Sequence, residues 1–197
     1  AAAGAAPRQR CIAVTAGFGG FGKVAKKPPC PCGSGNIYTE CCGKLHKTQQ
    51  MKPVSPEQLL RARFSAFAKK DWKYLMRTTH SANPAREGST AAPYGSSGTI
   101  KTTFQQDIMV TVGWTELSDL RLLDVRIGES GKEAEIDFEY GMKQLFELET
   151  GNKIKDPPMV QMSETSTFAM DEGEWKVLGS TTHNWDRETL QQTKPKA

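Results

Sequence analysis

Four cysteines within thirteen positions constrain the fold of this chain more than any other feature of its sequence. They form two pairs, Cys30 with Cys32 and Cys41 with Cys42, around a segment that can turn at Gly33-Ser34-Gly35. Four thiolates that converge on one point match the tetrahedral coordination of zinc, and a site with four protein ligands is structural because no position stays open for a substrate. The segment is too short for a core of its own, so we expect bound metal to supply its folding free energy.

Two other chemistries compete with a zinc site at these cysteines. A disulfide pair or redox thiols are one alternative, because adjacent cysteines and CxC pairs both occur in redox chemistry. The placement of all four thiols in one turn-containing loop favours the metal. Iron is the other alternative, since thiolate sets bind zinc or iron and spacing does not separate them. The fifth cysteine, Cys11, is expected to be an unpaired thiol in a flexible segment.

The cysteines belong to a longer motif. It runs from Pro29 to Gly35 and continues with Tyr38 and Cys41-Cys42-Gly43. This motif resembles the SEC-C zinc motif, named for the C-terminal tail of the SecA translocation ATPase. The resemblance implies one zinc ion per chain on Cys30, Cys32, Cys41 and Cys42. Because the motif of SecA docks a protein chaperone, it also implies a protein partner.

Later segments resemble the bacterial YchJ (UPF0225) family in their order along the chain. They are residues 55–67 and 74–80, which form a helical opening, and then residues 114–117, 164–168 and 173–177. The resemblance covers about residues 28 to 182. It implies an α+β fold, a nuclear-transport-factor-2-like cone in which a curved antiparallel sheet packs on helices, with a small zinc-binding hairpin before it. Ser163 stands where many members carry a histidine, which weakens any acid–base role at that position.

Composition and resemblance together divide the chain into five segments. They are a disordered basic leader like a transit peptide (1–27), a SEC-C zinc module (28–46), a linker (47–54), a YchJ-like domain (55–182) and a polar tail (183–197). The leader has no acidic residue and lacks the apolar core of a secretory signal, so it predicts an organellar protein. Its richness in Ala and Gly, with few arginines, favours the chloroplast over the mitochondrion. A disordered linker is the alternative.

Charge and hydropathy exclude some classes of protein. The net charge is +4, but the five basic residues of positions 1 to 39 account for it, and residues 40 to 197 carry −1. That average predicts no basic nucleic-acid platform. Lysines 26, 27, 44 and 47 surround the cysteines, however, and leave contact with the ribosome or RNA as an option, unless they only offset the thiolate charge. No apolar run approaches the ~20 residues of a membrane span.

The residue pattern predicts helices first and strands later, which is an α+β order. Ser55, Pro56 and Gln58 are typical of a helix start with a capping box, and the helix presents Leu60, Arg63, Phe64, Phe67 and Ala68 on one face. Asp71 is expected to cap a second helix that ends near His80, and residues 100–112 form a third, ambiguous helix. Alternation over 133–142, and again over 160–170, predicts strands that lead into a hairpin with Trp175.

The second predicted strand places a carboxylate among core residues. Glu164 has the same parity as Met162 and Phe168, so it should face the concave side of the sheet. We expect Arg63 to be its ion-pair partner, because a buried charge needs one. The alternative is a pocket with catalytic or ligand-binding side chains, for which the candidates are Arg63, His80, Tyr140, Glu164 and Ser166.

The sequence as a whole favours a non-enzymatic function. We expect a zinc-stabilised protein-binding or adaptor protein of an organelle, linked to protein translocation, assembly or quality control. The competing class is a small-molecule-binding or isomerase-like enzyme that uses the cone pocket. The third option is ribosome or RNA contact through the zinc module.

Overall fold

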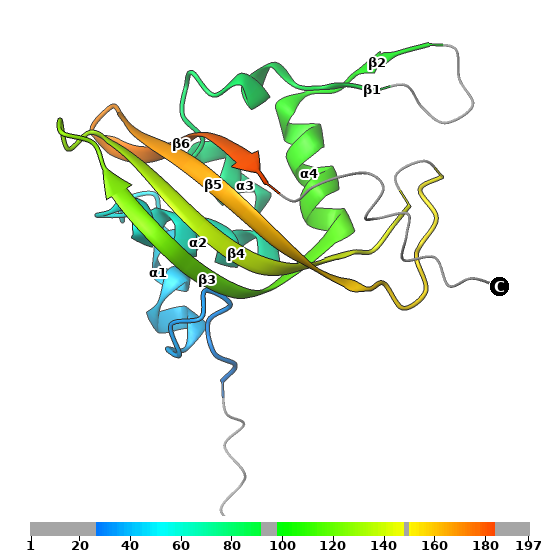
Figure 1. The fold of residues 1–197 in the computed structure, drawn as a ribbon, viewed down its shortest axis with the longest axis horizontal. Helices are drawn as coiled ribbons and strands as arrows, with labels where there is room; N and C mark the ends of the chain where they lie inside the picture. The colour runs from blue at the N-terminus through cyan, green and yellow to red at the C-terminus, as the bar shows by residue number, and fades with distance from the viewer. Residues whose placement is uncertain (1–26, 92–97, 148–149, 184–197) are drawn as a thin grey trace, which may run out of the picture.

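A curved antiparallel sheet with helices packed against one face makes up the body of the protein. The computed structural model describes residues 27–91, 98–147 and 150–183. Figure 1 shows the strands in front, helices α2 and α3 behind them, and the N-terminal cysteine segment with α1 below. The expected α+β cone is therefore confirmed. The leader (1–26) and most of the tail (184–197) lie outside the described residues.

The sheet has four strands in the order β3-β4-β5-β6, each antiparallel to the next. Their bounds are β3 Thr115–Ile127, β4 Glu133–Gln144, β5 Met159–Asp171 and β6 Glu174–Thr182. In β4 the apolar residues of the predicted alternation point to the helices, and both Ile136 and Phe138 are buried. The acidic residues between them lie on the other face, where Arg126 pairs with Asp124, Glu135 and Asp137.

Two capped helices cover the concave face. Helix α2 spans Pro56–Ala68 and α3 spans Trp72–Arg77. The Ser55 hydroxyl accepts a hydrogen bond from the amide of Gln58, as predicted, and the carboxylate of Asp71 accepts one from the amide of Tyr74. The Gln58 side chain reaches one residue further back than a capping box requires, because it accepts from the amide of Val54 rather than from the cap residue.

Helix α2 is buried on two sides. Leu60 and Phe64 pack with the sheet, as the predicted stripe requires. Ala62 and Ala66 form a second face, which packs against the cysteines, α1 and α3. The sequence pattern missed this face because alanines do not mark an apolar stripe. The cysteine segment and the helices that follow Ser55 thus share a core.

The third predicted helix begins later than expected. Helix α4 spans Phe104–Trp114 and starts with a capping box at Thr103. Residues Ile100–Lys101 instead form β2, which pairs with β1 at Thr90–Ala91. A 3-10 turn, η2 at Pro84–Glu87, lies in the segment before β1. In the part of the chain that the structure describes, no helix is long and apolar enough to cross a membrane.

Candidate metal centre

A tight hairpin brings the two cysteine pairs together. Pro29 and Ile37 form an antiparallel bridge, and the amide of Cys30 donates to the carbonyl of Asn36 at 2.7 Å. The turn between them needs two residues with positive φ, and glycines supply both, Gly33 and Gly35 at +77°. The chain then passes through the 3-10 turn η1 (Tyr38–Glu40) into helix α1 (Cys42–Lys47), which places the second pair at the helix start.

The four sulfur atoms have the spacing of a metal site. Each lies within 4.8 Å of the others. The Cys32 sulfur is 3.6 Å from that of Cys41, which is 3.9 Å from that of Cys42. A tetrahedral zinc ion with ~2.3 Å bonds to sulfur separates its ligands by about 3.8 Å. The described cysteines form no disulfide. The donor set and its spacing therefore fit zinc, which Cys30, Cys32, Cys41 and Cys42 would hold.

The surroundings of the sulfurs favour thiolates at one position and oppose them at others. Cys30, Cys32 and Cys42 are buried. Burial opposes ionisation of Cys30, but hydrogen bonds from Ser65 and from backbone amides outweigh it and lower the pKa of this thiol to about 7. Burial raises the pKa of the thiols of Cys32 and Cys42. A bound cation is what would stabilise these buried sulfurs as thiolates.

Hydrogen bonds tie the cysteine segment to the helices of the domain. The guanidinium of Arg61 donates to the carbonyl of Cys32 at 2.9 Å and pairs with Glu57. Arg77 donates to the carbonyl of Leu45, near the end of α1. These bonds run from α2 and α3 to both sides of the cluster, so the domain holds the site in place.

His46 is a buried part of this arrangement that the sequence reading did not single out. Its Nε2 lies 2.9 Å from the carbonyl oxygen of Ala62, which can only accept, so Nε2 carries the proton. Its Nδ1 then accepts from the Tyr38 hydroxyl at 2.8 Å. Burial lowers the pKa of His46, consistent with a neutral ring. The feature of the sequence that could have indicated a buried His46 is its position one helical turn after Cys42 on α1.

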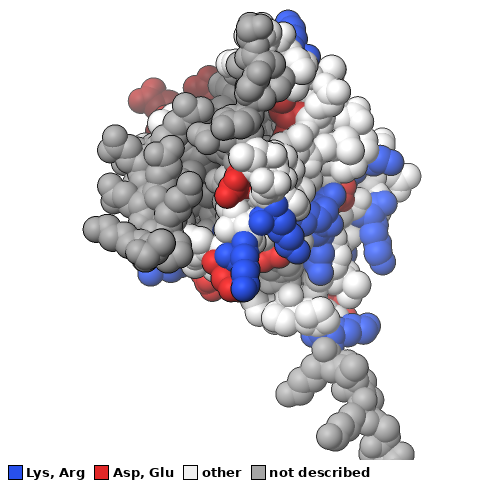
Figure 2. Space-filling view, turned by 90° about the vertical axis from the view of Figure 1, so that its right-hand side faces the viewer, with Lys and Arg blue, Asp and Glu red and all other residues white. Residues whose placement is uncertain are grey.

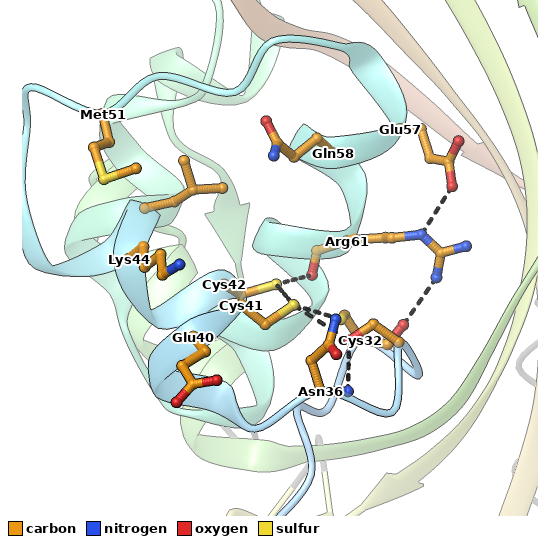
Figure 3. Close-up of a pocket in the computed structure, with 12 residues that line it drawn as sticks. Cys32, Asn36, Glu40, Cys41, Cys42, Lys44, Met51, Glu57, Gln58 and Arg61 are labelled. Atoms are coloured by element: carbon orange, nitrogen blue, oxygen red, sulfur yellow. Dashed lines mark hydrogen bonds and ion pairs between the residues drawn. The ribbon is translucent and has the colours of Figure 1, made fainter.

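A groove of about 400 Å³ opens beside the cluster, between the cysteine segment, α1 and the start of α2. Figure 3 shows Cys41 and Cys42 side by side in its wall, with Met51 and Lys44 on one flank and Arg61 and Glu57 on the other. Leu45 and Met51 supply apolar surface, and Met51 is 47% exposed. Cys32, Cys41 and Cys42 all line this groove, and of these three candidate ligands Cys41 is the most exposed.

Glu164 faces the concave side of the sheet, as the alternation of strand side chains predicted. The predicted ion pair with Arg63, however, is wrong. Glu164 is opposite Phe138 in the sheet register and faces the helices. It accepts hydrogen bonds from the hydroxyls of Tyr140 at 3.2 Å and Ser166 at 3.1 Å. Arg63 makes no ion pair with it. The Arg63 guanidinium instead donates to the carbonyl of Leu75 and to threonine hydroxyls at the end of α3.

Hydrogen-bond acceptors at the end of α3 explain why Arg63 does not pair with Glu164. The carbonyl groups at the end of a helix lack intrahelical donors, so a nearby guanidinium finds partners there. Burial lowers the pKa of Arg63 to about 10, and electrostatic interactions with Tyr74 and Glu164 offset this effect only in part. His80 is also engaged locally, because its Nδ1 accepts from the amide of Ala82. Of the five pocket candidates, the structure joins Tyr140, Glu164 and Ser166 in one hydrogen-bonded group and leaves Arg63 and His80 outside it.

Comparison with known proteins identifies relatives in sequence and in fold. Residues 55–180 match the family model described as YchJ, middle NTF2-like domain. A UPF0225 protein of Enterobacter sp. (strain 638) is 27% identical over 158 residues, which cover 80% of this chain and 86% of that protein. A UPF0225 protein of Streptomyces coelicolor is 45% identical over 60 residues, 30% of this chain and 48% of that protein.

Two solved structures share the fold. The solution structure of a SEC-C motif containing protein from Rhodopseudomonas palustris matches with a TM-score of 0.56 at 23% identity, over 80% of this chain and 100% of that chain. A crystal structure of a SEC-C motif containing protein from Psychrobacter arcticus matches with a TM-score of 0.54 at 20% identity, over 77% and 80%.

The relatives correct the expected location. They come from bacteria, including Enterobacter, Sodalis, Streptomyces, Deinococcus and Shewanella. An organellar, chloroplast protein, which the basic leader suggested, is therefore wrong. Ala/Gly-rich basic composition is a weak signal because it also occurs in segments without a targeting role. With its cysteine motif, its NTF2-like domain and these relatives, the chain belongs to the YchJ (UPF0225) family of SEC-C motif proteins.

Proposed function

We propose that this protein is a zinc-stabilised adaptor that binds a polypeptide segment of a partner protein in the groove beside its metal centre. The observation that carries the proposal is that Cys32, Cys41 and Cys42 are themselves wall residues of the groove. Metal binding would therefore fix the shape of the groove as well as the fold of the cysteine segment.

The chemistry of the groove suits a polypeptide. Leu45 and Met51 offer apolar contact, and the flexible thioether of Met51 adapts to different side chains. Around them stand hydrogen-bonding groups, Asn36, Gln58 and Lys44 among them, which can pair with a peptide backbone. The resemblance of the cysteine motif to the chaperone-docking tail of SecA supports a partner in protein translocation, assembly or quality control.

The enzyme alternative receives less support from the concave face. A catalytic carboxylate must reach a substrate, whereas both oxygens of Glu164 accept hydrogen bonds from neighbouring hydroxyls, Tyr140 and Ser166. Arg63 is likewise committed to α3. These bonds favour a role for the group in holding the sheet together.

Site-specific photo-crosslinking tests the proposal. A photoreactive residue at Met51 should capture one defined protein from a bacterial lysate of a related species, and the Cys42→Ser substitution should abolish that capture. Met159 is the matched control, because it is similarly exposed, at 50% against 47%, but lies on β5. Equal capture from both positions, or capture from Met51 that survives loss of the metal, would overturn the proposed groove.

A further inference from the structure

The charge of this protein is divided between its two layers. Residues 27–80, which include the cysteine segment, α1, α2 and α3, contain ten Lys or Arg and three Asp or Glu, a formal net charge of +7. Residues 81–183, which include the whole four-stranded sheet, contain nine Lys or Arg and seventeen Asp or Glu, a net charge of −8. The near-neutral average over the chain conceals a molecule with a basic helical layer and an acidic sheet.

Five of the eight Lys and Arg residues of this layer that make no ion pair lie on one surface, which we call the basic face. It is made of side chains from α1, from the turn between α2 and α3, and from α3, namely Lys44, Lys47, Lys69, Lys73 and Arg77. Contacts join these elements. The Lys69 ammonium lies 5.2 Å from the ring centre of Tyr38 in η1, and Arg77 donates to the carbonyl of Leu45 in α1. Lys73 precedes Arg77 by one helical turn.

Figure 2 views the molecule from the right-hand side of Figure 1, so the side of the sheet on which α2 and α3 lie in Figure 1 is toward the right of this view. Lys and Arg side chains gather over the lower and right-hand parts of this view.

The lysines of the basic face lack counter-ions. Among the described residues, the ion pairs of lysine and arginine involve Lys52, Arg61, Arg121, Arg126 and Lys176, none of which belongs to this face. Two acidic residues lie nearby. Asp71 is engaged in capping α3, and Glu40 lines the groove beside Lys44. The five cations therefore exceed the nearby carboxylates by three, and the excess is available to an external anion.

Aromatic rings alternate with these cations. Tyr38 and Trp72 are partly exposed, and each has a lysine near its face, Lys69 at 5.2 Å and Lys73 at 5.5 Å from the ring centre. Cations that track a phosphate backbone, interleaved with rings on which bases stack, are the components of surfaces that bind single-stranded nucleic acid. An acidic polypeptide would use the cations but would gain less from the rings.

We propose that the basic face binds single-stranded nucleic acid through its phosphate backbone, with base stacking on Trp72 and Tyr38. The acidic sheet repels the same ligand and so orients it toward the helices. This inference goes beyond the peptide groove, because the basic face shares only Lys44 with the groove. Substitution of Lys69 and Lys73, which do not line the groove, should leave crosslinking from Met51 unchanged. Together the two surfaces would let the protein bridge a nucleic acid and a protein partner.

Fluorescence anisotropy with the full, metal-loaded chain tests the proposal. The probes are labelled oligo-U RNA and oligo-dT DNA of about 12 nucleotides, a length within the range of single-strand sites. We expect saturable binding, which the double substitution Lys69→Gln and Lys73→Gln weakens roughly tenfold. The slope of log K against log salt should fall in magnitude by about 1.4, since each phosphate contact contributes about 0.7. The matched control, Lys153→Gln with Lys155→Gln in the segment before β5, removes the same charge and should leave both quantities nearly unchanged.

A second variant separates nucleic acid from other polyanions. Trp72→Ala should weaken binding of the oligonucleotides without changing the salt slope, because stacking releases no counter-ions. Circular dichroism melting checks that each variant is folded. The proposal is overturned if no binding saturates below about 100 µM protein at low salt, or if the two double variants weaken binding equally. It is also overturned if polyglutamate of matched charge competes as well as oligo-U, which would assign the face to an acidic polypeptide.

Discussion

The hydroxyl oxygen of Ser65 lies 3.4 Å from the sulfur of Cys30, across 35 positions of the chain. Ser65 is on the face of α2 that packs against the cysteines, and it is fully buried. A helix of the NTF2-like domain therefore supplies a hydrogen bond to a candidate metal ligand. This hydrogen bond directly connects the cysteine motif, which resembles SEC-C, with the YchJ domain.

Substitution of Ser65 should weaken metal binding. Groups that hydrogen-bond to metal ligands commonly contribute 10- to 100-fold to affinity. We expect Ser65→Ala to lower zinc affinity about tenfold in competition with a chromogenic chelator. Ser34→Ala is the control, because the Ser34 hydroxyl lies 3.2 Å from the Cys41 sulfur but is exposed, so water can replace it. A larger loss of zinc affinity for Ser34→Ala than for Ser65→Ala would contradict a special role of α2 in metal binding.

Loss of the metal should destabilise helix α2 of the domain. Cys42→Ser removes a buried ligand, and Ala62 and Ala66 share a core with the cysteines. We expect amide hydrogen exchange of residues 59–66 to accelerate in this variant, while the amides of β4 and β5 stay protected. If the exchange of α2 were unchanged, the cysteine segment would be an independent module, as the polar linker of residues 47–54 suggests.

The concave carboxylate should act as a hydrogen-bond acceptor rather than as an ion-pair partner. Glu164→Gln keeps an acceptor for Tyr140 and should cost less than about 1 kcal/mol of unfolding free energy. Glu164→Leu leaves the hydroxyls of Tyr140 and Ser166 without an acceptor and should cost about 2 kcal/mol. Urea unfolding measures both. If Gln were as costly as Leu, the charge of Glu164, and hence its interaction with Arg63, would dominate.

Asp171 should contribute to stability in a pH-dependent way. The amide of Ser81 and then Lys176 lower the pKa of its carboxyl to about 2. Because the folded pKa lies below the unfolded value of about 3.9, this contribution is complete above about pH 4 and disappears as the pH falls toward 2. We expect Asp171→Asn to cost about 0.5 to 1 kcal/mol at pH 6, discounted for solvent exposure, and nothing near pH 2.

The measurement is the difference in urea midpoint between Asp171→Asn and the unaltered protein, taken from pH 6 down to pH 2. A difference is needed because acid would also protonate the cysteine ligands of a bound metal and release it from both proteins. The control is Asp156→Asn, at an exposed position before β5. A midpoint difference that persists at pH 2 would assign the effect to packing rather than to ionisation.

Local and periodic features of this fold were predictable from the sequence. Cysteine spacing with two glycines specifies a hairpin within a few residues, and strand parity fixed the face of Glu164 because side chains alternate strictly. The partner of Arg63 was not predictable in the same way. It depends on how close the end of α3 comes to α2, which is a property of tertiary packing.

Two further misses have the same physical origin. The second buried face of α2 consists of small residues, Ala62, Ser65 and Ala66, whose burial depends on what packs against them. The basic face is invisible in the net charge because the compensating carboxylates lie on the sheet. Sequence averages do not show which charges share a surface.

The central claim is that Cys30, Cys32, Cys41 and Cys42 hold one metal ion and that this ion shapes the surface used for binding. Elemental analysis of the reduced protein, purified without added metal, tests it most directly. We expect one zinc ion per chain and none in the Cys42→Ser variant. Reduced protein that is folded but free of metal would contradict the claim.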